Sequence, residues 1–184
     1  IPLKKNQKPN ETEKGGAKLT DFLNNEEMNI VHIISDTISI NLKSDSIYEF
    51  LHGMRLKSYS FDKYKSKKKI KILKVNIISS KNLNKKIYDK FKSIETGVNY
   101  TKDLVSEPGN ILHPDEYAKR LTQLKKIGLK VSVYNEKQLK KMGCNALVGV
   151  GQGSIRGTYL VTLEWRGKRS NSKPLAFVGK GVCF

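Results

Sequence analysis

The chain has 184 residues, enough for one ordinary domain or for a small domain joined to part of another. Its 35 basic and 17 acidic side chains give a formal charge of +18, and a hydrophobic content of 38% permits a core. No stretch approaches the roughly 20 apolar residues of a membrane-spanning helix. The two cysteines, Cys144 and Cys183, exclude a disulfide framework and indicate a reducing cytoplasm.

The positive charge has two interpretations. Between Lys63 and Lys92 there are twelve lysines and one acidic residue, Asp89, and three aromatic residues stand just before or within the start of this run: Tyr59, Phe61 and Tyr64. Such a segment could bind nucleic acid. It contains no arginine, however, and no known nucleic-acid motif accompanies it, so a solvated lysine surface is favoured. A non-enzymatic, lysine-rich nucleic-acid-binding module remains the alternative.

The first part of the chain predicts a small α/β unit. Residues 1–18 carry two prolines and a Gly-Gly pair, which are typical of a loop. A short helix is predicted over 19–28, followed by a β-branched strand over 29–41. Ser44 or Asp45 could cap the next helix, whose apolar positions fall at helical spacing: Ile47, Phe50, Leu51 and Met54.

A basic loop, a strand and a long helix are predicted next. Residues 70–78 alternate between apolar and polar, as a strand does. From residue 85 to about 105 the pattern is helical, with an apolar face formed by Ile87, Phe91, Ile94, Val98 and Leu104. Lysine then thins out, and glycine and proline become regular. We therefore expect residues 85–105 to connect two domains, with a boundary between Asp103 and Pro108.

The remaining residues predict alternating helices and strands. After a turn-rich loop, Pro114 can occupy the first position of a helix that ends at Gly128, with Tyr117, Leu121 and Leu124 on its buried side. A strand over 129–134, a helix over 135–143 and two strands, 158–165 and 175–181, should follow. This order is typical of an α/β domain with a largely parallel sheet.

The segment "GVGQGS", with Gly149, Gly151 and Gly153, invites a comparison with dinucleotide-binding loops. Such a loop must lead into a helix whose N-terminus receives the pyrophosphate. Here the next predicted element is a strand, so nucleotide binding is rejected and a glycine loop beside something bulky is expected. The three histidines, His32, His52 and His113, are too scattered to predict a metal cluster.

Lys180 is the residue of most interest, because it stands between Gly179 and Gly181 at the end of an apolar strand. Open α/β sheets place their chemistry at the carboxyl ends of strands. Composition alone favours a surface lysine in a turn. Ile1 in place of Met, and the abrupt ending after "FVGKGVCF", predict that the chain is a piece of a longer protein.

Three segments, in order and spacing, resemble the leucyl (cytosol) aminopeptidase family: "DLVSEPGNILHPDEYA", "GCNALVGVGQGS" and "LAFVGKGVCF". The resemblance is close from Asp103 onward and weaker before, although "GMRLKSYSFDKYKSKKK" resembles the end of the family's N-terminal domain. Cys144-Asn145 departs from the family pattern, which has a small or apolar residue followed by glycine.

The resemblance implies a macro-domain-like N-terminal part over 1–84, a connecting helix over 85–105, and the first part of an α/β/α metallopeptidase domain over 106–184. It also implies a cytoplasmic homohexamer that removes N-terminal residues, leucine preferred, from peptides with a free N-terminus. Two divalent metal ions, zinc or manganese, would be its cofactors, with Lys180 as a ligand through a neutral amine. The family's other ligands would follow Phe184, so we expect no catalytic residue within the chain and no activity from it alone.

Overall fold

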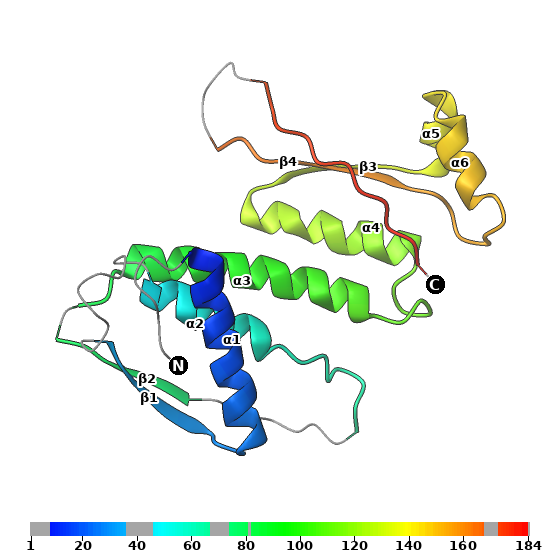
Figure 1. Cartoon of the computed structure of the whole chain (residues 1–184). Helices are drawn as coiled ribbons and strands as arrows, with labels where there is room; N and C mark the ends of the chain where they lie inside the picture. The colour runs from blue at the N-terminus through cyan, green and yellow to red at the C-terminus, as the bar shows by residue number, and fades with distance from the viewer. Residues whose placement is uncertain (1–7, 36–45, 67–73, 81, 168–172, 184) are drawn as a thin grey trace. The chain divides into compact units, whose positions relative to one another are not determined.

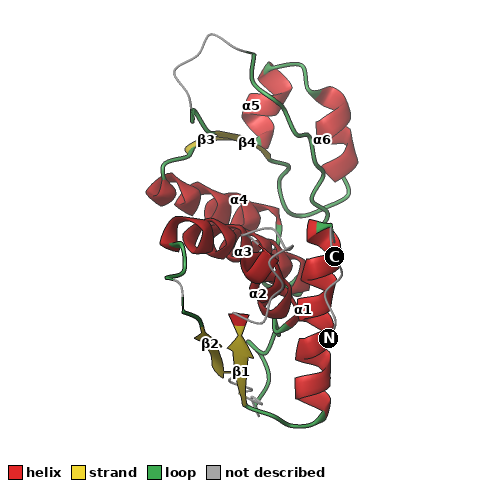
Figure 2. Ribbon diagram, turned by 60° about the vertical axis from the view of Figure 1, so that its left-hand side comes forward, coloured by secondary structure: helices red, strands yellow, loops and turns green. Residues whose placement is uncertain are grey.

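The computed structural model describes residues 8–35, 46–66, 74–80, 82–167 and 173–183. The chain forms two compact units, which meet in sequence between Ser106 and Glu107. Each unit mixes helices and strands, so the α/β expectation is confirmed (Figures 1 and 2). No helix among the described residues combines the length and the apolar character that crossing a membrane requires.

Among its described residues, the first unit contains three α-helices and a two-stranded parallel sheet. Its elements are α1 (Pro9–Asn25), β1 (Ile30–Ile34), α2 (Ser46–Lys57), β2 (Lys74–Ile78) and α3 (Lys85–Ser106). The strands pair with Ile30 opposite Lys74 and Ile34 opposite Ile78. The predicted strand residues 36–41 and 70–73, the caps at 44 and 45, and part of the lysine-rich segment lie outside the described residues.

The core of the first unit lies between α2 and one face of the sheet. The four apolar positions predicted for α2 are all buried, as the helical spacing indicated: Ile47, Phe50, Leu51 and Met54. They pack against inward-facing strand residues and against the first turns of α3, at Val31, Ile33, Val75, Ile77, Ile87, Tyr88 and Phe91. The opposite face of the sheet leaves three isoleucines about half exposed: Ile30, Ile34 and Ile78.

The prediction of a loop over residues 1–18 is wrong from Pro9 onward, because α1 begins there and continues through the Gly-Gly pair. The glycines allow α1 to cross α2 in backbone contact. A β-carbon on Gly16 would lie 1.9 Å from the carbonyl oxygen of Phe50, and one on Gly53 would lie 1.8 Å from that of Glu13. The hydroxyl of Thr20 can donate to the carbonyl of Gly16 within α1 or, across the crossing, to the carbonyl of Met54 in α2. These glycines therefore allow two helices to pack closely and do not form a turn.

The long helix predicted over 85–105 is confirmed as α3. Polar contacts attach it to α2 and to the segment that follows α2. The Arg55 guanidinium donates to the Glu95 carboxylate at 2.9 Å, and Lys102 Nζ donates to the carbonyl of Leu56 at 3.0 Å. Tyr59 donates to Asp103 at 2.8 Å. The helix is therefore part of the first unit along its length.

The second unit contains α4 (Pro114–Thr122), the 3-10 helix η2 (Gln123–Ile127), β3 (Lys130–Tyr134), α5 (Glu136–Lys141), α6 (Asn145–Gly151) and β4 (Leu160–Glu164). Pro114 occupies the first turn of α4, and Gly128 ends η2 with φ 96°, as predicted. The ring of the only tryptophan, Trp165, lies 3.2 Å from where a β-carbon on Gly128 would be. Asn135 caps α5 by accepting from the backbone N–H of Gln138.

Three expectations for the second unit are wrong. Strands β3 and β4 pair antiparallel, not parallel, with Lys130 opposite Glu164. Gly149 and Gly151 belong to α6, so the first half of the glycine segment is helix instead of loop, while Gly153 lies in the turn that follows. The run over 175–181 forms no strand with any of the described residues, and its side chains are open to solvent, with Phe177 89% and Val178 99% exposed. A strand requires a hydrogen-bonded neighbour, and none of the described residues pairs with this run.

Candidate functional site

The segment that carries Lys180 lies against the beginning of α4. A β-carbon on Gly181 would be 2.7 Å from Cε1 of Tyr117, whereas nothing lies within 4 Å of one on Gly179. Lys180 itself is exposed. Two residues further along the chain from Gly181, Cys183 is partly buried. Gly181 therefore packs against α4, and Lys180, the residue before it, is exposed. Figure 1 shows the C-terminal end of the chain near α4.

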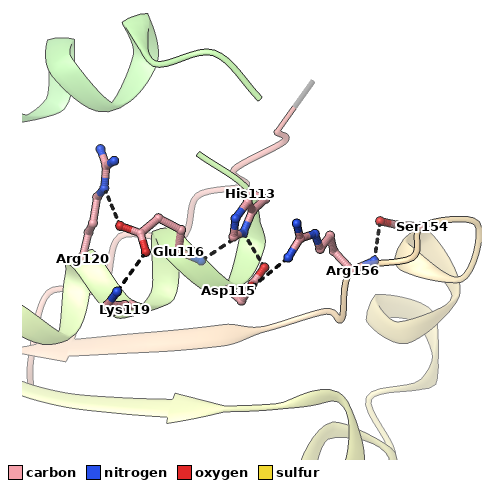
Figure 3. A network of polar contacts seen from close by, with 7 residues as sticks. All are labelled: His113, Asp115, Glu116, Lys119, Arg120, Ser154 and Arg156. Carbon is pink, nitrogen blue, oxygen red and sulfur yellow. Dashed lines mark hydrogen bonds and ion pairs between the residues drawn. The ribbon is translucent and has the colours of Figure 1, made fainter. Parts of the chain in front are cut away.

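The first turn of α4 carries a network of polar contacts, drawn in Figure 3. His113 Nδ1 lies 2.5 Å from Asp115 Oδ1 and 3.4 Å from the backbone nitrogen of Glu116. These two contacts are alternatives: Nδ1 donates to Asp115 when it carries the ring proton, and it accepts from the Glu116 N–H when it does not. Asp115 Oδ2 accepts from Arg156 at 3.3 Å, and the backbone N–H of Arg156 donates to the Ser154 hydroxyl. This network attaches the turn after α6 to the start of α4.

Charges in this network shift three pKa values. Burial would raise the pKa of Asp115, but its own backbone N–H, His113 and Arg156 outweigh that contribution and hold the pKa below its ordinary value. The hydrogen bond from Arg120 lowers the pKa of Glu116, and Lys119 adds to the effect. Burial raises the pKa of the Cys183 thiol, and the negative charge of Asp115 raises it further. A thiol in this state is a poor nucleophile at neutral pH.

A buried ion pair fixes α4 to the loop that precedes it. Arg120 Nη1 donates to Glu107 Oε1 at 2.8 Å, and the Glu107 side chain is only 1% exposed. The same guanidinium donates to Glu116 through Nε at 3.1 Å. Because both carboxylates share one guanidinium, the loop over 107–113 and the first two turns of α4 are held in one arrangement.

The histidines occupy three unrelated environments. His32 is exposed on β1, and His113 precedes α4. His52 is buried against the ring of Phe91, and its Nδ1 has no hydrogen-bond partner among the described residues. Within the described ranges, no three His, Cys, Asp or Glu side chains are grouped as a metal ion would require. The described residues therefore place no cluster of three such ligands beside Lys180.

A cavity of about 310 Å³ lies in the first unit among α2, β2 and α3. Its lining is mixed: Leu51, Met54, Arg55, Ser58, Val75, Ile77 and Tyr88. The guanidinium at its edge is already engaged by Glu95 and by the hydroxyl of Tyr88.

Sequence reasoning identified Lys180 and the start of α4 but missed what links them. Tyr117 was expected only as part of a buried helix face, and Asp115 and Arg156 were not singled out. The closeness of Tyr117 to Gly181 spans 64 positions of sequence, so no local pattern could indicate it. Pro114 marks the start of the helix, and Asp115 follows it directly. These two residues were the sequence signal for a negatively charged first turn.

Comparisons with known proteins agree with the sequence motifs. A family model described as "Cytosol aminopeptidase family, catalytic domain" matches residues 99–184. A probable cytosol aminopeptidase of Phytoplasma australiense is 43% identical over 159 residues, which cover 85% of this chain and 32% of the relative. One of Brucella ovis is 38% identical over 177 residues, covering 92% of this chain and 35% of the relative. The chain thus spans about a third of the length of the curated relatives it matches.

Solved structures resemble the chain in fold. The bottromycin maturation enzyme BotP in complex with Mn aligns with a TM-score of 0.70 and 18% identity, over 86% of this chain and 33% of that one. A mutant of tomato leucine aminopeptidase aligns with a TM-score of 0.69 and 17% identity, over 84% and 33%. At these identities the likeness establishes the mixed α/β fold alone. The family model and the relatives carry the assignment: residues 99–184 match the catalytic domain of the cytosol aminopeptidase family, and most of the chain is similar to probable cytosol aminopeptidases.

Proposed function

We propose that the chain is the front portion of a leucyl aminopeptidase, which as a complete protein hydrolyses N-terminal residues, leucine preferred, from peptides with a free N-terminus. The match of residues 99–184 to the family's catalytic domain is the observation that carries this proposal. The 43% identity to a probable cytosol aminopeptidase supports it.

Two divalent metal ions, manganese or zinc, are the proposed cofactors, and Lys180 is the proposed ligand within this chain. Its exposure and the open space around Gly179 leave room for a ligand role. The described residues supply no carboxylate cluster beside it. One amine cannot hold two dications, so the 184-residue chain should bind metal weakly and should not catalyse peptide hydrolysis by itself.

The finer architecture is also a proposal. We infer that the first unit is the later part of a macro-domain-like N-terminal domain, with α3 as the connecting helix, and that residues 106–184 begin an α/β/α catalytic domain. The parallel pairing of β1 and β2 beneath three helices, and the division at Ser106, support this arrangement. A cytoplasmic homohexamer is the proposed assembly of the complete protein.

A chimera tests the function directly. The third of the Phytoplasma australiense relative that matches this chain would be replaced by the chain, and hydrolysis of leucine p-nitroanilide would be measured with added Mn²⁺ or Zn²⁺. We expect metal-dependent turnover that EDTA abolishes, and none from the 184-residue chain alone. Lys180→Met in the chimera should lower turnover by about 100-fold or more, as loss of a metal ligand does. Lys173→Met, at another exposed lysine of the same segment, should leave turnover unchanged.

Two results would contradict the proposal. Appreciable turnover by the 184-residue chain alone would show that Lys180 does not depend on further ligands. A folded chimera that hydrolyses no aminoacyl substrate with either metal would remove the aminopeptidase assignment. Circular dichroism and size-exclusion chromatography establish that the chimera is folded before either conclusion is drawn.

A further inference from the structure

The two glycines that flank Lys180 occupy different environments. Around Gly179, a β-carbon would meet nothing within 4 Å. At Gly181, a β-carbon would fall 2.7 Å from Cε1 of Tyr117, closer than packed side chains approach one another, and 3.4 Å from Cδ1. The backbone of Gly181 therefore lies directly against the edge of the Tyr117 ring, and only this second glycine is required by packing.

The contact continues beyond Gly181. Cys183 is partly buried, and the charge of Asp115 in the first turn of α4 acts on its thiol. The segment thus lies against Tyr117 at Gly181 and within the range of the Asp115 charge at Cys183. The side chains of residues 173–180 are exposed, whereas Gly181 packs against Tyr117.

The helix that carries Tyr117 is well fixed. It begins at Pro114 and is held by the Asp115 contacts to His113 and Arg156 on one side of the turn. One turn further, the buried Arg120–Glu107 pair anchors the helix to the preceding loop. A side chain on such an element can determine where a neighbouring backbone segment lies.

We propose that Tyr117 is a positioning residue for Lys180: its ring is a seat for the backbone at Gly181, and this seat determines where the Lys180 amine is presented. Position 181 is glycine because the seat leaves no space for a β-carbon. The purpose of this positioning, metal ligation by Lys180, rests on the proposed function. The seat itself depends only on the packing of the second unit.

The thiol of Cys183 reports whether the segment is seated. In a Cys144→Ser background, Cys183 is the single cysteine, and its rate of reaction with Ellman's reagent measures its accessibility. Gly181→Ala should raise this rate by about 3-fold or more, because the added methyl group must displace the segment or the ring. The matched control Gly179→Ala should leave the rate unchanged. Tyr117→Phe, which keeps the ring carbons that touch Gly181, should also leave it unchanged.

A double-mutant cycle separates this seat from a general loosening. Tyr117→Ala removes the ring, so Gly181→Ala added to Tyr117→Ala should cause no further increase in rate. Equal rates for Gly181→Ala and the parent would overturn the proposal, as would full additivity of the two substitutions. Far-UV circular dichroism confirms that every variant keeps its helices.

The same variants in the chimera keep the two proposals distinguishable. Gly181→Ala should lower kcat for leucine p-nitroanilide, while Gly179→Ala and Tyr117→Phe should not. If the thiol rates follow the expectation but kcat does not respond, the seat stands and the metal role of Lys180 fails. If the thiol rates do not respond, the seat fails whatever the activity.

Discussion

Gly16 of α1 and Phe50 of α2 are in backbone contact, so close that a β-carbon on Gly16 would lie 1.9 Å from the Phe50 carbonyl oxygen. Gly53 makes the reciprocal approach to Glu13 in α1. The two helices therefore cross at a separation that only glycine permits, and the core residue Met54 lies directly beside this crossing. The stability of the first unit should therefore depend on having glycine, with no β-carbon, at both positions.

Gly16→Ala and Gly53→Ala should each destabilise the chain by about 2 kcal/mol or more, because the helices must separate to admit the methyl group. Gly97→Ala is the matched control, since it lies within α3 with nothing within 4 Å of its added carbon. That substitution should stabilise by about 0.5–1 kcal/mol through helix propensity. Urea unfolding followed by circular dichroism measures all three, and equal effects at the three positions would contradict the close crossing.

Glu107→Gln should destabilise the second unit by about 2 kcal/mol, because it leaves the partly buried Arg120 guanidinium without a charged partner on that side. The control is Glu164→Gln. Glu164 pairs with Lys130 and Arg166, but its side chain is 41% exposed, so its loss should change the stability little. We expect a larger drop in urea midpoint for Glu107→Gln than for Glu164→Gln. Comparable drops would show that the buried pair contributes no more to stability than a surface pair.

Glu116 should make the stability of the second unit depend on acid pH. Its pKa is lowered in the folded state from an ordinary value of 4.5, chiefly by the hydrogen bond from Arg120. The unfolded chain therefore binds this proton first, so the stabilisation is present above about pH 4.5 and is lost as the pH falls through the lower folded pKa. The difference in urea midpoint between the chain and Glu116→Gln should thus be largest near pH 7 and should shrink toward pH 3. A difference that does not vary with pH would contradict this assignment.

His52→Phe should stabilise the first unit by about 1 kcal/mol. The His52 ring packs 5.1 Å from the centroid of Phe91, and its buried Nδ1 has no partner among the described residues. Phenylalanine keeps the ring and removes the cost of burying an unsatisfied nitrogen. His52→Ala is the comparison: it should destabilise by about 2 kcal/mol or more, since it leaves a cavity. A loss of stability in His52→Phe would mean that the nitrogen does have a partner.

The elements with a strong local pattern were predictable from the sequence. Helix α2 was identified by the spacing of its buried apolar side chains, and α4 by Pro114 at its start. Helix α3 was found almost to its last residue. In these cases the signals of periodicity and capping are local, and the folded chain obeys them.

The errors arose where distant contacts override local preference. Gly15-Gly16 has a loop-like composition, but its helix is stabilised by α2, about 35 positions away in sequence. The antiparallel pairing of β3 with β4 cannot be read from either strand alone. The run at 175–178 is apolar enough for a strand, yet a strand is defined by a partner, and none of the described residues pairs with it.

For the candidate site, sequence motifs supplied Lys180 but not its setting. The Gly-Lys-Gly sequence does not distinguish its two glycines, but their surroundings differ in the structure. Gly179 has open space around it, and Gly181 lies against Tyr117. The metal role of Lys180 remains a prediction. Its test requires ligands beyond the single amine that the described residues contribute.

The position of Trp165 has a practical consequence for these measurements. It is the only tryptophan in the chain, and it belongs to the second unit, where its ring lies beside Gly128. Its fluorescence therefore reports the unfolding of the second unit alone, while far-UV circular dichroism follows the helices of both. If the two signals change at different urea concentrations, the units unfold independently, and a substitution in either one can be assigned to its own transition.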